Sequence, residues 1–344
     1  MNTKVIRTDG IQIDNASLSL SAQILRKGGL VVFPTETVYG LGGNGTDDSA
    51  AKKIYAAKGR PSDNPLIIHI SEPKQAEDYA YTNDTYYQLA KAFMPGPITV
   101  ILPKKDSVPL SVTGGLDTVA IRCPSHPIAR ALIDAAGIPI AAPSANLSGK
   151  PSPTCARHVI EDLEGRVDVI IDGGDCEIGL ESTIIRLDGN QATLLRPGAI
   201  TADALLCVCE SVTVAPSVLE ELKKDERPLS PGMKYKHYAP EAPLVLLDGT
   251  EEDVLSFLSK EKENKHCAVL CYTEELGLLE NHTVIDIGRA NDLDTQARTL
   301  FTALRDADKL GVDVIYAHLP PKDGIGLALY NRMIRAAAHT IRKV

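Results

Sequence analysis

Hydrophobic positions in the first two-thirds of the chain fall into short, separate runs. Eight runs have the length and the branched aliphatic content typical of buried strands; they cover residues 30–33, 65–70, 98–102, 118–122, 138–142, 167–172, 182–187 and 192–196. Between them, residues 49–58 and 126–137 repeat apolar positions with helical spacing. The pattern therefore predicts an α/β fold in which helices pack on one large mixed sheet.

The pattern changes after residue 200. Residues 201–229 are typical of a helix with a charged exit, and SPGMKYKHYAPEAP (230–243) is rich in proline and poor in aliphatic residues. Beyond this stretch, strand-like and helix-like segments alternate, which predicts a small parallel, doubly wound sheet of about 100 residues. We therefore predict a large domain at 1–208, a linker at 209–241 and a small α/β domain at 242–344.

Composition narrows the function classes. The net charge of −9 over 344 residues argues against a protein whose main task is gripping a nucleic-acid backbone. None of the seven cysteines forms a CxxC pair and the eight histidines are scattered, so we expect reduced thiols and no structural zinc. Because no apolar run approaches the roughly 20 residues of a membrane span, we expect a cytoplasmic protein.

A glycine-rich stretch, GLGGNG (40–45), matches the pattern of dinucleotide-binding loops. That pattern should lie directly between a strand and a helix, with an acidic residue at the tip of the next strand. Here PTETVY separates the strand from the first glycine, and the acid at the required distance, Asp63, lies between prolines. We interpret the glycines instead as sites of close approach to backbone or ligand.

The stretch KGRPSDNPL (58–66) combines two cations with a stiff loop. Lys58 followed by Gly59 is typical of a helix end, with a cation in the last turn and glycine at the cap. A cap needs neither Arg60 nor the rigid PSDNP that follows. Lysine and arginine on such a loop suit phosphate oxygens, so we expect Lys58 to be exposed to a ligand cleft.

Polar residues also follow other predicted strands. Arg122 ends an apolar strand and needs a carboxylate partner, from the protein or from a ligand. Ser144 and Asn146 come after the strand at 138–142, where loops of open α/β sheets bind ligands. The structural alternative for this region is a helix N-cap near Ser152 or Thr154.

Six stretches carry a resemblance to a known family: FPTETVYGLG (33–42), KGRPSDNPLIIHI (58–70), MPGPITVIL (94–102), APSANLSGKPSPT (142–154), ESTII (181–185) and LLRPG (194–198). In this order they resemble the motifs of the YrdC/Sua5 family of threonylcarbamoyl-AMP synthases. The linker and small domain look like the long Sua5 form. The resemblance implies a twisted-sheet YrdC-like catalytic domain followed by a Rossmann-like Sua5 domain.

The family makes threonylcarbamoyl-AMP and pyrophosphate from L-threonine, bicarbonate or CO2, and ATP, with Mg2+ expected on the phosphates rather than on protein side chains. Partner proteins then transfer the threonylcarbamoyl group to tRNA. The resemblance implies catalytic roles for four residues, which also hold ATP: Lys58, Arg60, Ser144 and Asn146. It implies further ATP contacts from Ser62, Thr118, Ser152, Arg196 and the linker residue Tyr235, and a threonine pocket lined by Thr35, His69, Arg122 and Ser182.

Other interpretations stay open at this stage. The chain could be an RNA-binding module without catalysis, although its acidic balance disfavours this. It could transfer a simple carbamoyl group, as larger proteins with a YrdC-like domain do, but those need additional domains. His69 could be a satisfied core histidine, and the linker a plain spacer.

Overall fold

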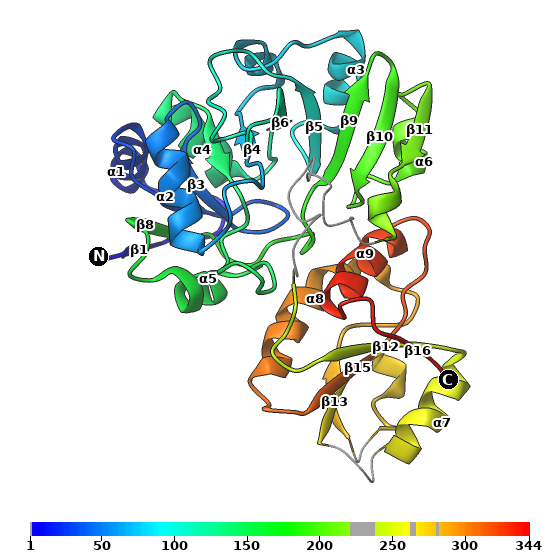
Figure 1. Ribbon diagram of the computed structural model, residues 1–344. Coiled ribbons are helices and arrows are strands. Elements are labelled where there is room, and N and C mark those ends of the chain that lie inside the picture. Colours follow the sequence, from blue (N-terminus) through cyan, green and yellow to red (C-terminus); the bar gives the residue numbers. More distant parts are fainter. Residues whose placement is uncertain (1, 221–237, 262–265, 280–281) are drawn as a thin grey trace. The chain divides into compact units, whose positions relative to one another are not determined.

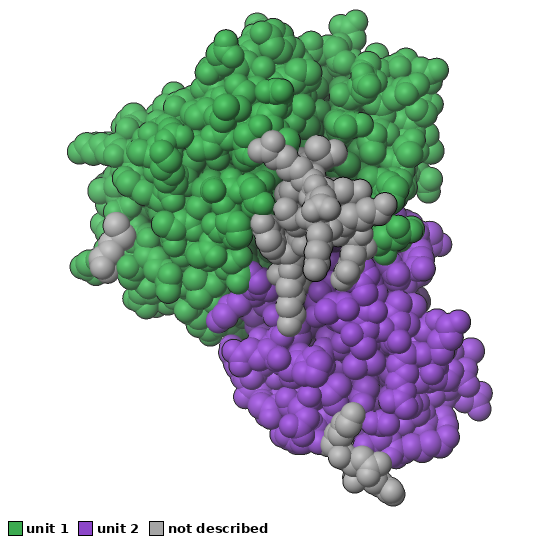
Figure 2. All heavy atoms as spheres, in the orientation of Figure 1, with its two compact units in different colours: residues 1–148, 152–234 green, residues 149–151, 235–344 purple. Residues whose placement is uncertain are grey.

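The computed structural model describes residues 2–220, 238–261, 266–279 and 282–344. The chain divides into two compact units, shown in different colours in Figure 2. Unit 1 comprises residues 1–148 and 152–234, and unit 2 comprises residues 149–151 and 235–344. The predicted linker residues 221–237, Tyr235 among them, lie outside the described part.

Unit 1 is built on a mixed sheet, to which its described residues contribute eleven strands in the order β1-β8-β2-β3-β7-β4-β6-β5-β9-β10-β11 (Figure 1). Parallel and antiparallel pairs both occur along it; for example, β4 runs parallel to β6 and antiparallel to β7. The strands are β1 (Lys4–Arg7), β2 (Val31–Phe33), β3 (Gly40–Asn44), β4 (Ile67–His69), β5 (Ile98–Pro103), β6 (Thr118–Arg122), β7 (Ile140–Ala142), β8 (Val169–Asp172), β9 (Thr183–Asp188), β10 (Gln191–Arg196) and β11 (Ser211–Val214).

All eight apolar runs form strands of this sheet, which confirms the predicted mixed architecture. The sequence pattern missed β1, β3 and β11. After residue 200, helix α6 covers only Ala202–Leu206, and β11 then pairs with β10 at the sheet edge. The first part of the predicted linker therefore contributes a strand to unit 1.

The glycines of GLGGNG lie in and beside β3 rather than in a strand-to-helix turn. A Cβ atom on Gly42 would lie 2.7 Å from Ile140 Cγ2 and 2.8 Å from Phe33 Cε1. A Cβ atom on Gly45 would lie 2.6 Å from Ile68 Cδ1. The predicted close approach to backbone is present, since the same Cβ atoms would lie 3.1 Å from the Val31 and Pro139 carbonyl oxygens, and the side chains of β2, β7 and β4 come closer still.

Helices cover the sheet of unit 1 (Figure 1). Their ends follow local rules: Asp47 accepts a hydrogen bond at the start of α2, and Gly59 ends it with φ 61°. Helices α1 and α4 pack over one face, and their core includes Leu25, Leu132 and Phe33. No described helix is both long and apolar enough to span a membrane. The helices are α1 (Asn15–Arg26), α2 (Asp48–Lys58), α3 (Asp84–Phe93), α4 (Pro127–Ala136), α5 (Ala156–Leu163) and α6 (Ala202–Leu206).

Unit 2 contains the predicted parallel, doubly wound sheet. Its described strands follow the order β14-β13-β15-β12-β16, and every neighbouring pair is parallel. Residues 149–151 group with this unit because Arg305 donates to the Pro151 carbonyl at 2.7 Å. The elements are β12 (Leu244–Asp248), α7 (Glu251–Glu261), β13 (Cys267–Cys271), β14 (Thr283–Asp286), α8 (Leu293–Asp308), β15 (Val314–His318), α9 (Gly326–Ala336) and β16 (Ile341–Lys343).

Candidate active site

Lys58, the last residue of α2, points its ammonium at the loop after β7. Its Nζ donates to the Ser144 carbonyl at 2.5 Å and to the Asn146 carbonyl at 2.6 Å. The Asn146 Oδ1 lies 3.2 Å from the same nitrogen and accepts from Ser144 Oγ at 2.6 Å. The fold therefore brings together three of the four predicted catalytic residues, although Lys58 lies more than 80 positions from the other two in sequence.

The prediction that Lys58 is exposed to a cleft is wrong, because the residue is only 3% exposed. A buried ammonium loses hydration, and the oxygens of the 144–146 loop replace it with charge-assisted hydrogen bonds. The helix-end interpretation is confirmed too, since Gly59 forms the left-handed cap. Lys58 thus ends a helix and anchors a loop.

The remaining residues of the basic loop lie differently. Arg60 Nη2 lies 3.3 Å from both the Asn64 and the Pro65 carbonyls, which folds the loop back on itself. Ser62 is exposed. Thr118 begins β6, about 13 Å along the strand from Arg122 at its end. Within the described ranges, no side-chain hydrogen bond joins Ser62 or Thr118 to the other predicted residues.

Arg122 is buried, and the tripeptide 35–37 surrounds one of its nitrogens. Nη2 lies 2.8 Å from Glu36 Oε1, 2.8 Å from Thr37 Oγ1 and 3.4 Å from Thr35 Oγ1. The protein carboxylate that the sequence left as one alternative is therefore Glu36. Arg122 Nε, however, is buried with no hydrogen-bond partner in the described part of the chain. Such a buried donor without a partner calls for an explanation, since nearly all buried polar groups are hydrogen-bonded.

His69 ends β4 beside Arg122, its register partner on β6. The imidazole is 3% exposed, donates from Nδ1 to the Ile67 carbonyl at 3.0 Å and meets Phe33 edge to face. Burial, and secondarily the Arg122 charge, lower the pKa of His69 to about 3. The ring is therefore neutral near pH 7.

Ser182 and Arg196 form one connected group across β5, β9 and β10. Ser182 Oγ lies 2.7 Å from Thr99 Oγ1, and Thr99 is the register partner of Arg122. Arg196 donates from Nη2 to Ser182 Oγ and from Nε to the Ser182 carbonyl, both at 3.1 Å. A predicted threonine-side residue, Ser182, thus directly contacts a predicted ATP-side residue, Arg196.

Ser152 is buried and donates to Glu181 Oε1 at 2.5 Å. The alternative of an N-cap at Ser152 or Thr154 is wrong, since the N-cap residue of α5 is Cys155 and it makes no side-chain capping bond. The Ser152 hydroxyl is used for a contact between loops instead.

Sequence reasoning missed four buried residues that organise this region. They are Glu36, Thr37, Thr99 and Glu181. Glu36 lies inside the quoted stretch FPTETVYGLG, so a search for a carboxylate to pair with Arg122 could have found it.

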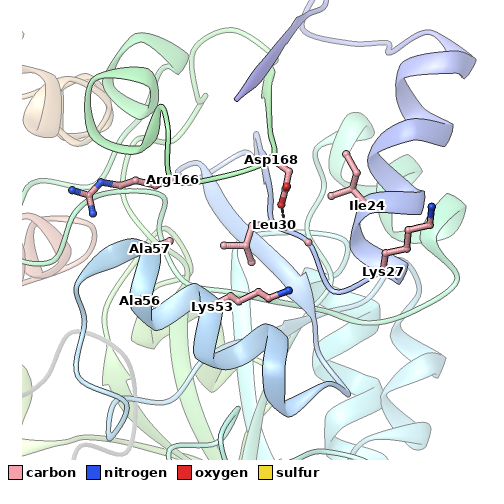
Figure 3. A pocket seen from close by; sticks show the side chains of 9 residues that line it. Ile24, Lys27, Leu30, Lys53, Ala56, Ala57, Arg166 and Asp168 are labelled. Atoms are coloured by element: carbon pink, nitrogen blue, oxygen red, sulfur yellow. Dashed lines mark hydrogen bonds between the residues drawn. The ribbon is translucent and has the colours of Figure 1, made fainter. Parts of the chain in front are cut away.

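A pocket of about 520 Å³ in unit 1 lies elsewhere, between the end of α1, the start of β2, α2 and the loop before β8 (Figure 3). None of the predicted site residues lines it. Figure 3 shows Lys27 and Arg166 on opposite sides, with the Asp168 carboxylate turned to the Leu30 N–H that it bonds at 2.8 Å. Lys53 donates to the Gly28 carbonyl at 2.7 Å, so this basic side chain is engaged by the backbone.

The lowered pKa of His69 makes unit 1 sensitive to acid. Its folded-state pKa of about 3 lies below the unfolded value of 6.5, so the unfolded state binds the extra proton between these values. Stability should be complete above pH 6.5 and fall by up to about 1.4 kcal/mol per pH unit as the pH drops towards 3. In denaturant titrations at pH 7 and pH 5, His69→Gln should lessen this loss and the exposed control His266→Gln should not. An equal loss in wild type and His69→Gln would contradict the assignment.

Comparisons with known proteins cover nearly the whole chain. A family model described as "Telomere recombination" (Sua5/YciO/YrdC) matches residues 23–198, and one described as "Threonylcarbamoyl-AMP synthase, C-terminal domain" matches residues 200–338. The chain is 46% identical over 333 residues to the threonylcarbamoyl-AMP synthase of Bacillus subtilis, covering 96% of this chain and 95% of the relative. It is 44% identical over 339 residues to that of Pyrococcus abyssi, covering 97% of each. The crystal structure of P. abyssi Sua5 complexed with L-threonine superposes with a TM-score of 0.90 at 42% identity, covering 100% of each chain.

Proposed function

This chain belongs to the threonylcarbamoyl-AMP synthase family, and on that premise we propose that unit 1 forms threonylcarbamoyl-AMP from L-threonine, bicarbonate or CO2, and ATP. The observation that carries the proposal is the buried Arg122, whose Nε has no partner in the described residues. A substrate carboxylate would satisfy that edge of the guanidinium.

The threonine pocket in this proposal is centred on Arg122. Thr35, whose hydroxyl donates to the Val38 carbonyl at 2.6 Å, lines the pocket together with Ser182, and the neutral His69 adds no charge that would compete for the carboxylate. The contacts among Thr35, Arg122, Thr99 and Ser182 fix these side chains before substrate arrives. Such preorganisation lowers the entropy cost of binding.

The ATP phosphates would meet the group formed by Lys58, Ser144 and Asn146. Its hydrogen bonds hold the loop at 144–146 to the end of α2. Arg60, Ser62, Thr118, Ser152, Arg196 and Tyr235 complete the proposed nucleotide side on the strength of the family resemblance. The contact between Ser182 and Arg196 supports placing the two substrates next to each other.

The chemistry needs no protein nucleophile. The threonine amine takes up CO2 to form a carbamate, and a carbamate oxygen attacks the α-phosphorus of ATP while pyrophosphate leaves. Arg122 holds the amino acid, and Lys58 and its loop hold the phosphates, so that the attacking oxygen and the phosphorus are in line. Cationic groups that are already in place stabilise the charge that develops on the phosphate oxygens.

Mg2+ would enter with ATP and neutralise phosphate charge. In this proposal the ion is carried by the phosphates, because Mg2+ usually keeps several waters and binds through substrate phosphates. We further propose that separate proteins transfer the threonylcarbamoyl group to tRNA. This chain itself is expected to bind nucleic acid only weakly and to act in the cytoplasm.

The test is pyrophosphate release by the purified full chain with ATP and Mg2+. L-threonine and bicarbonate are withheld one at a time, and L-serine replaces threonine in a fourth reaction. We expect release only when both co-substrates are present, with serine a poor replacement. Release that is indifferent to threonine would contradict the proposed function.

A further inference from the structure

Glu36 makes contacts that set it apart from the residues expected to touch substrate. Both of its carboxylate oxygens are already engaged: Oε1 by Arg122 Nη2 at 2.8 Å and Oε2 by the Ser125 N–H at 3.2 Å. Its carbonyl accepts from the Ile178 N–H at 2.9 Å. Both oxygens of the Glu36 carboxylate are therefore held in place by the protein.

The hydrogen bonds of the Arg122 guanidinium are concentrated on one nitrogen, Nη2. Glu36 and Thr37 both lie 2.8 Å from Nη2, whereas Nε has no partner among the described residues and Nη1 makes no hydrogen bond there. A protein carboxylate that served only as a salt bridge could take two guanidinium nitrogens at once. This one takes a single nitrogen and leaves the others.

We propose that Glu36 is a positioning residue for the amino-acid substrate: it fixes the rotation of the Arg122 guanidinium so that the Nε edge faces the threonine carboxylate. The inference rests on the proposed function and deepens it. Glu36 also offsets the Arg122 charge. The buried pair is then close to neutral, which suits an amino acid because it carries one positive and one negative charge.

Removing the Glu36 charge should change the preference for a carboxylate ligand in opposite directions, depending on whether Glu36 acts through its charge or by orienting Arg122. The two roles can therefore be told apart by experiment. If Glu36 acted only through its charge, Glu36→Gln would leave the pocket more positive and strengthen the preference for a carboxylate. If Glu36 orients Arg122, the same variant lets the guanidinium rotate and weakens that preference. The ratio of the affinities for L-threonine and for L-threoninamide, which lacks the carboxylate, reports this preference.

The experiment is calorimetric titration of the full chain with each of these two ligands. Glu36→Gln should lower the threonine-to-threoninamide affinity ratio by about tenfold. The matched control is Glu177→Gln: Glu177 is exposed and lines the same pocket of about 420 Å³ as Glu36 and Ser125. This control should keep the wild-type ratio.

The affinity ratio of Glu36→Gln decides whether Glu36 positions Arg122. An unchanged or raised ratio in Glu36→Gln, with or without a lower melting temperature, would overturn the positioning role. Should that variant fail to fold, Glu36→Asp, which keeps the charge but shortens the reach, should lower the ratio in the same direction and by a smaller factor. Wild-type protein that binds neither ligand would instead overturn the proposed function.

Discussion

Arg122→Lys is expected to raise the KM for L-threonine while leaving the KM for ATP almost unchanged. Lysine keeps a positive charge beside Glu36, which avoids leaving that buried carboxylate unpaired. It lacks the planar guanidinium and therefore the Nε edge. Loss of charge-assisted hydrogen bonds of about 1.5–3 kcal/mol corresponds to roughly a 10- to 150-fold higher KM for threonine.

The measurement is initial-rate kinetics with each substrate varied in turn. Arg186→Lys is the matched control, because Arg186 is exposed on β9 and should leave both KM values as in the wild type. A folded Arg122→Lys enzyme with a normal threonine KM would show that Arg122 is only the structural partner of Glu36.

Lys58→Met is expected to abolish most ATP use and to spare threonine binding. Methionine keeps a similar length but removes the ammonium that holds the 144–146 loop in place, and misplacing this preorganised loop should cost about 100- to 1,000-fold in kcat. Because the Ser144 and Asn146 carbonyls lose their partner, the variant should also lose about 1–3 kcal/mol of stability. Threonine affinity, measured by calorimetry, should stay within about a factor of two.

The control for Lys58→Met is Lys53→Met on the same helix. Lys53 also donates to a backbone carbonyl, that of Gly28 at 2.7 Å, but it lines the pocket of Figure 3. Its replacement should leave ATP use intact. If Lys58→Met folds and turns over ATP normally, Lys58 only ends α2 and holds its loop.

Sequence patterns predicted the parts of the fold that depend on aliphatic burial. Runs such as 98–102 and 118–122 are strands because their branched side chains fill both faces of a covered sheet. Strand β3 was missed because glycine has a low strand propensity and its close packing against Ile140 and Phe33 is not visible in local sequence. Strand β11 was missed because its pairing with β10 is tertiary.

Sequence motifs nominated the candidate site residues one by one, but they could not show which of these residues lie in contact. The contact between Lys58 and Ser144 joins residues that are 86 positions apart, so no local sequence pattern predicts it. The Glu36 carboxylate lies in a polar stretch, PTETVY, where a charge looks exposed; only the fold reveals that it is 4% exposed beside Arg122. Burial of Lys58 has the same origin, since the loop at 144–146 closes over it.

The central claim is that this chain joins threonine, a one-carbon unit and AMP in a single product. The most direct measurement is mass spectrometry of the product formed from ATP, L-threonine and isotopically labelled bicarbonate. The account predicts threonylcarbamoyl-AMP that carries the label. An unlabelled threonyl adenylate, or AMP with no amino-acid adduct, would contradict it.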